Sequence, residues 1–185
     1  MRYLIGLILS IAVIVFIIIK LLGGGGGSTV SVTPKSLASY ATSDVTVRYT
    51  IDNPVQAAQT HNDVSIDVGN AQAVMTVTRG YDGEIVRTKS YPMSVTAYET
   101  FLLSLDRTGN FTSGNTDPAL LDERGFCANG NRYLYEIIGS DGAAIQHFWS
   151  TSCGVKTFRG DSKEVERLFI NQIPDYASML EGISI

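Results

Sequence analysis

Two cysteines and two histidines are the residues of this chain whose chemistry depends most on the partners they meet. Cys127, Cys153, His61 and His147 could together supply four metal ligands. Metal sites usually take such ligands from closely spaced pairs, CxxC or HxxxH, and neither pattern occurs here. An even number of cysteines in a chain with features of export favours a disulfide instead. We therefore predict one disulfide, Cys127 to Cys153.

Cys153 lies in the sequence TSCG, which superficially suits a cysteine nucleophile. Such a nucleophile needs a free thiolate beside an imidazole, and a disulfide with Cys127 removes the thiol. His147 alternates with Ile145 and Trp149 on a β-rich run, where a lone histidine normally serves packing. We therefore expect no catalytic residue, no cofactor and no metal site.

Acidic side chains in an irregular segment, residues 112–125, are the next candidates. The length of this segment is typical of a functional loop or of a covering strap. Asp117, Asp122 and Glu123 lie in it and could bind a cation. Their spacing lacks the alternating oxygen ligands and the glycine of a calcium loop, so solvated loop charge is the plainer interpretation.

Aromatic side chains crowd one predicted hairpin: Tyr133, Tyr135, Phe148 and Trp149. Packing in the core is the commoner use of such rings, although exposed aromatic rings also bind ligands. Tyr133, Tyr135 and Trp149, with the three loop carboxylates, are therefore the candidate residues of a binding surface.

The hairpin itself consists of residues 132–138 and 143–151, joined by Gly-Ser-Asp-Gly. With Asp141-Gly142 as a two-residue turn, residue i faces residue 283 minus i. Cys127 then faces about residue 156, and a bulge or a longer turn brings it to Cys153. The predicted disulfide therefore closes the open end of this hairpin.

The strands and helices that must position these residues can be predicted from the spacing of apolar side chains. Four more β-rich runs precede the hairpin, at residues 44–52, 64–68, 71–79 and 84–91. Helical stripes occur at residues 94–107 and 162–172, where Ser94 or Thr96 and then Asp161 are candidate N-caps. These patterns predict an α+β domain: a mostly antiparallel sheet of five to seven strands, covered by two helices near residues 95–107 and 162–172.

The first segment of the chain, residues 3–22, is apolar except for Ser10 and Lys20. Its length is close to the roughly 20 residues that a helix needs to cross a lipid bilayer. It is longer than the apolar part of a cleaved signal and lacks an Ala-x-Ala site. We interpret it as an uncleaved transmembrane signal-anchor, with cleavage within the glycines as the alternative.

The anchor divides the chain into three parts. Residues 1–22 are the single-pass transmembrane segment, residues 23–43 a glycine-rich linker and entry segment, and residues 44–185 an extracytoplasmic domain. The basic residues beside the apolar run do not decide its orientation. The predicted disulfide does, since persistent disulfides form on the oxidising side of a membrane.

The charge of the chain argues against nucleic-acid binding. There are 14 Lys and Arg against 18 Asp and Glu, which gives a net charge of −4 and an isoelectric point near 5.1. The basic residues are scattered rather than clustered, so the electrostatic footprint of a nucleic-acid partner is absent.

Several stretches carry a resemblance: GFCANGNRYLYEI, HFWSTSCG, TFRG and LFINQIPDY. With them, most of residues 44–176 resembles a group of uncharacterised single-pass proteins of candidate-phylum bacteria, the Saccharibacteria. The resemblance implies an amino-terminal anchor, a glycine-rich spacer, an extracytoplasmic domain and paired cysteines, but no activity. A looser similarity, in the order of elements alone, is to protease-inhibitor-like α+β scaffolds, and such similarity is weak support for function.

The function expected from the sequence is therefore binding. We expect a membrane-anchored extracytoplasmic binding or interaction domain whose partners are the lipid bilayer, through residues 3–22, and an envelope or extracellular protein. The alternative is an envelope hydrolase or protease-inhibitor-like module that acts through the 112–125 loop.

Overall fold

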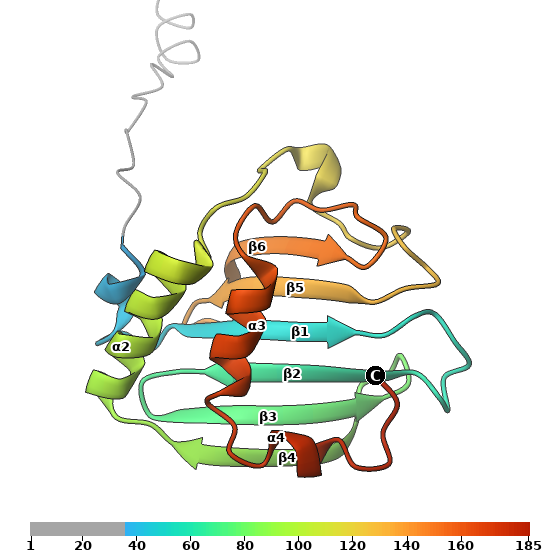
Figure 1. Cartoon of the computed structure of the whole chain (residues 1–185), viewed down its shortest axis with the longest axis horizontal. Helices are drawn as coiled ribbons and strands as arrows, with labels where there is room; N and C mark the ends of the chain where they lie inside the picture. Colours follow the sequence, from blue (N-terminus) through green and yellow to red (C-terminus); the bar gives the residue numbers. More distant parts are fainter. Residues whose placement is uncertain (1–35) are drawn as a thin grey trace, which may run out of the picture. The chain divides into compact units, whose positions relative to one another are not determined.

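The computed structural model describes residues 36–185, so the predicted anchor and residues 23–35 of the linker lie outside the described residues. No helix within residues 36–185 has the length and apolar character needed to span a membrane. The described part is α+β and is built on one six-stranded antiparallel sheet with the order β4-β3-β2-β1-β5-β6 (Figure 1). The strands are Thr46–Asp52 (β1), Asn62–Val68 (β2), Gln72–Arg79 (β3), Glu84–Pro92 (β4), Arg132–Ile138 (β5) and Ala144–Thr151 (β6).

β1 lies near the middle of the sheet because its neighbours come from both halves of the sequence. It pairs with β2, which follows it directly, and with β5, so that Tyr49 faces both Ile66 and Tyr135. The predicted alternation is confirmed: Val47, Tyr49 and Ile51 are buried, and the residues between them are half-buried. One face of the strand therefore belongs to the core.

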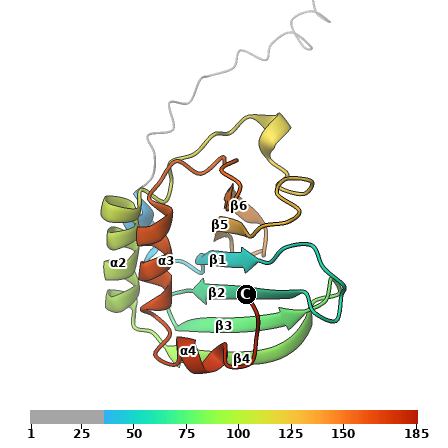
Figure 2. The ribbon, with the colours of Figure 1, turned by 45° about the vertical axis from the view of Figure 1, so that its right-hand side comes forward.

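The helices cover one face of the sheet (Figures 1 and 2). Tyr49 lies on this face, since its ring packs against that of Phe169 with centroids 5.6 Å apart. Ser94 caps α2 (Val95–Ser104) by accepting from the amide of Ala97. Asp161 caps α3 (Ser162–Ile170) by accepting from the amide of Glu164, as the sequence predicted. Short helical turns complete the set: η1 (Leu37–Tyr40), η2 (Leu105–Gly109), η3 (Pro118–Leu120) and α4 (Tyr176–Met179). The predicted helical stripe is confirmed, since Tyr98, Phe101 and Leu102 of α2 and Leu105 of η2 are all buried.

The opposite face of the sheet carries mainly polar side chains, and the register places them in rows. Asp67, Arg48, Glu136 and His147 form one row across β2, β1, β5 and β6. Asp63, Asp52 and Arg132 form a second row near one end of the same strands. We call this side the open face.

The β5–β6 hairpin confirms the predicted register over most of its length. Arg132 faces Thr151 and Ile137 faces Gln146, pairs that follow 283 minus i. A bulge after Ile137 shifts the last pair, and Gly142 at φ 79° closes a turn longer than two residues. Cys127 and Cys153 form the predicted disulfide, with 5.7 Å between their Cα atoms.

Candidate functional site

The aromatic side chains singled out by sequence separate onto the two faces of the sheet. Tyr135 faces Phe148 across the hairpin, whereas Trp149 faces Leu134, and side chains alternate along each strand. Trp149 is fully buried on the open face, where its Nε1 donates to the Leu120 carbonyl at 2.7 Å. Trp149 is thus held by the loop and does not contact Tyr133 or Tyr135 as part of one binding surface.

Tyr133 and Tyr135 instead line a pocket on the helix-covered face, which we call the tyrosine pocket. Its other lining residues are Tyr49 from β1 and three residues of α3: Ser162, Lys163 and Glu166. The rings of Tyr49 and Tyr133 are parallel within 1°, with centroids 6.5 Å apart. Tyr49 and Tyr135 are buried and fix the floor, while Tyr133 is half-buried.

Glu166 is the acidic group of the tyrosine pocket. Burial raises the pKa of its carboxyl group above the ordinary value. Burial also raises the pKa of the Tyr49 hydroxyl, and the nearby Glu166 carboxylate adds to that effect. Within residues 36–185, Glu166 forms no hydrogen bond and no ion pair. The pocket therefore combines aromatic rings, a carboxylate that forms no ion pair within residues 36–185, and the exposed Lys163.

The three loop carboxylates do not act together. Asp117 accepts from the amide of Ala119 and begins η3, while Asp122 is exposed and pairs with Arg124. Glu123 reaches the open face and lies 3.0 Å from His147. Each carboxylate thus serves a separate local contact.

His147 is held by carboxylates on both ring nitrogens. Its Nε2 lies 3.0 Å from Glu123 and its Nδ1 lies 3.0 Å from Glu136. These hydrogen bonds, the one to Glu123 first, raise the pKa of His147 to about 9 despite partial burial. His147 is therefore a positively charged link between β5, β6 and the loop, rather than the simple packing residue that its strand position suggested.

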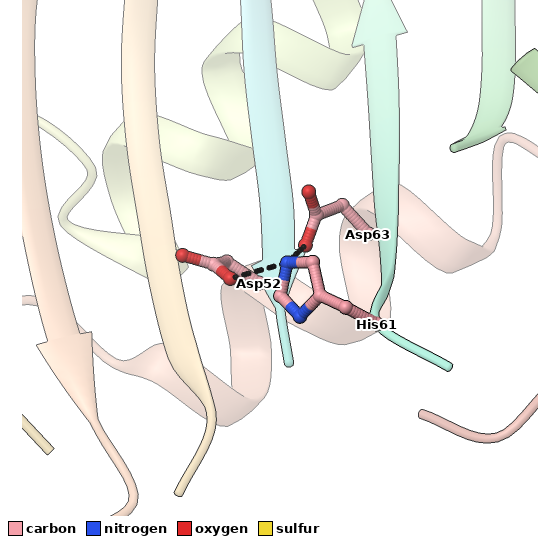
Figure 3. A group of neighbouring side chains, drawn as sticks. All are labelled: Asp52, His61 and Asp63. Atoms are coloured by element: carbon pink, nitrogen blue, oxygen red, sulfur yellow. Dashed lines mark ion pairs between the residues drawn. The ribbon is translucent and has the colours of Figure 1, made fainter. Parts of the chain in front are cut away.

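A cluster that the sequence analysis missed lies at the connection from β1 to β2. Asp52 ends β1, His61 directly precedes β2 and Asp63 lies within it; their ligand atoms come within 4.8 Å of one another (Figure 3). Burial, followed by the charge of Asp52, raises the pKa of Asp63 to about 6. This is the group of described residues that could hold a metal ion. The available sequence signal was the placement of all three around one strand connection.

No protein-family model matches this chain, and neither a curated protein nor a solved structure proved similar to it. The resemblance to Saccharibacterial single-pass proteins therefore stays a prediction.

Proposed function

We propose that this protein is a membrane-anchored extracytoplasmic binding domain that takes a small organic cation into the tyrosine pocket. The anchor is the apolar run at residues 3–22. The disulfide between Cys127 and Cys153 supports an oxidising location for the domain.

The observation that carries the binding proposal is Glu166 beside three tyrosines, with no ion pair to it among residues 36–185, although Lys163 also lines the pocket. Glu166 is half-buried, and partial loss of hydration is unfavourable for a carboxylate without an ion-pair partner. A bound cation offsets that cost. The faces of tyrosine rings also attract cations, by about 0.5–2 kcal/mol depending on desolvation. Ammonium groups suit both features, whereas an anion would meet Glu166.

Titration of the full chain in detergent micelles with tetramethylammonium chloride tests the pocket. We expect saturable binding that weakens at least tenfold in Glu166→Gln. Glu99→Gln removes an exposed carboxylate from α2 and serves as the matched control. Equal binding by wild type and Glu166→Gln, or no saturable binding at all, would refute the proposed ligand class.

The proposed location has a separate test. Protease added to intact cells that express the full chain should degrade residues 36–185, and cytoplasmic markers should survive. A domain that becomes accessible only after lysis would contradict the extracytoplasmic orientation.

No contact in the described residues favours the alternative of an envelope hydrolase or inhibitor acting through the loop. Asp117, Asp122 and Glu123 are engaged separately, as a helix cap, an exposed ion pair and a link to His147. Such an enzyme would need carboxylates that converge on one substrate.

A further inference from the structure

We infer that Asp52, His61 and Asp63 form a binding site for a divalent transition-metal ion of the zinc type. His61 Nε2 lies 3.1 Å from Asp63 Oδ1 and 3.6 Å from Asp52 Oδ1 (Figure 3). A tetrahedral ion with bonds of about 2.0–2.1 Å holds its ligand atoms about 3.3 Å apart. His61 Nε2 is therefore spaced from each carboxylate oxygen about as such an ion requires, and all three ligand atoms lie within 4.8 Å of one another.

The hydrogen bond on the other side of the His61 ring supports this inference. Nδ1 lies 3.2 Å from the Pro54 carbonyl oxygen, which can only accept, so Nδ1 carries the hydrogen. In the neutral ring, Nε2 then presents a lone pair to the carboxylates. Metal-binding histidines are typically oriented in this way, by a hydrogen bond from the distal N–H to a carbonyl or a carboxylate.

The two carboxylate oxygens nearest His61 have no hydrogen-bond partner among the described residues. Asp52 Oδ1 and Asp63 Oδ1 are both buried, and neither accepts a hydrogen bond. A proton on Nε2 would form ion pairs with the two oxygens at 3.1 and 3.6 Å, but neither oxygen accepts a hydrogen bond from the ring. A metal ion bonds to all three atoms at once, so it removes the repulsion and satisfies both oxygens.

The surroundings hold the three ligands in place. The His61 side chain is 2% exposed, and the ring of Tyr81 stacks on it with 4.3 Å between centroids. Arg132 lies 2.6 Å from Asp52 Oδ2, which leaves Oδ1 for the ion. The Asp63 side chain is 31% exposed, so a water molecule can complete the coordination from that side.

His147 differs from His61 in having no ring nitrogen available to a metal ion. Both nitrogens of His147 are already bonded to carboxylates, so no lone pair remains for a metal. At His61 one nitrogen is anchored and the other faces the two aspartates. One imidazole with two carboxylates suits zinc and its neighbours better than calcium or magnesium, which prefer oxygen ligands alone.

Calorimetric titration of the metal-stripped full chain in detergent micelles with ZnCl₂ tests the site. We expect one zinc per chain and a zinc-dependent rise in the melting temperature, with no effect of millimolar Mg²⁺. His61→Gln should weaken zinc binding at least a hundredfold and Asp63→Asn at least tenfold. His147→Gln, which removes the other imidazole, should bind zinc as wild type does, and so should Glu166→Gln.

Asp63→Asn keeps the size of the side chain, so it remains informative if His61→Gln fails to fold. Co²⁺ gives a second readout, because its visible absorption should show nitrogen and oxygen ligation in the wild type and change in Asp63→Asn. The inference is overturned if the stripped protein takes up no zinc, or if Asp63→Asn and His147→Gln bind it equally well. Since Glu166 lies in the separate tyrosine pocket, failure of cation binding there would leave this result intact.

Discussion

His61 and His147 have opposite roles because their carboxylate partners are arranged differently. Glu123 and Glu136 approach the two nitrogens of His147 from opposite sides, which favours the charged imidazolium. At His61 both aspartates meet the same nitrogen, while the Pro54 carbonyl holds the other. The first arrangement stores a proton, and the second suits a metal ion.

The raised pKa of His147 predicts how stability depends on pH. Its pKa is about 9 in the folded domain, against about 6.5 when unfolded. Its contribution, of up to about 3 kcal/mol, is therefore fully present below pH 6.5 and is lost as the pH rises through 9. Urea unfolding between pH 6 and 10 should show this loss in the wild type.

His147→Gln supplies the comparison for that measurement. The variant should be less stable at pH 6 and should lose little further stability towards pH 10. Arg159→Gln changes an exposed side chain and controls for surface charge. Parallel pH profiles of wild type and His147→Gln would show that the two ion pairs contribute nothing.

At the scale of elements, the disulfide stabilises the open end of the β5–β6 hairpin. Cys127 and Cys153 are 26 residues apart and flank the two strands. Closing a loop of that length lowers the entropy of the unfolded chain by an amount worth about 3 kcal/mol. The double variant Cys127→Ser/Cys153→Ser should therefore unfold with a free energy lower by about that amount, as measured in urea.

Treating the wild type with reductant should reproduce the result for the double variant. Equal stability of the oxidised and reduced proteins would mean that the loop is already ordered without the bond.

Gly130 lies beside the bridge, where an added Cβ would come within 2.7 Å of Cys127 Sγ. Gly130→Ala should therefore disturb the bridge itself.

The strands and helices were predictable because each shows its period locally. Val47, Tyr49 and Ile51 repeat every second residue, and Tyr98, Phe101, Leu102 and Leu105 follow the helical stripe. The local order of residues does not show which strands become neighbours. The separation of Trp149 from Tyr133 and Tyr135 follows from the predicted hairpin register, which pairs Trp149 with Leu134. The pairing of β5 with β1, which brings Tyr49 into the tyrosine pocket, joins residues 80 or more positions apart and could not be predicted locally.

The cluster at His61 was hidden for a related reason. Asp52 and Asp63 stand at ordinary polar positions of two alternating strands, and nothing in their spacing resembles a metal motif. They meet only because β1 and β2 pair so that Asp52 faces Asp63. Pairing register, rather than residue spacing, creates this site.

At the scale of the whole described domain, the sheet joins two chain segments through a single ladder. β1 to β4 follow one another as a meander, while β5 and β6 form a separate hairpin that pairs only with β1. The long-range β1–β5 ladder, with Tyr49 opposite Tyr135, connects the two. Both proposed ligand-binding sites depend on β1, since Tyr49 and Asp52 belong to it.

Native-state hydrogen exchange should reveal this organisation. Amides of β1 have partners on both sides and should exchange only on global unfolding. β4 is an edge strand with mostly exposed side chains, so its amides should open at a free energy below that of global unfolding. The other edge, β6, is backed by the returning chain, where the amides of Thr157 and Phe158 donate to the Trp149 carbonyl. We therefore expect the amides of β1 to be protected most from exchange, those of β6 less and those of β4 least. Equal protection of the two edge strands would contradict a sheet that is more stable on the side of the disulfide.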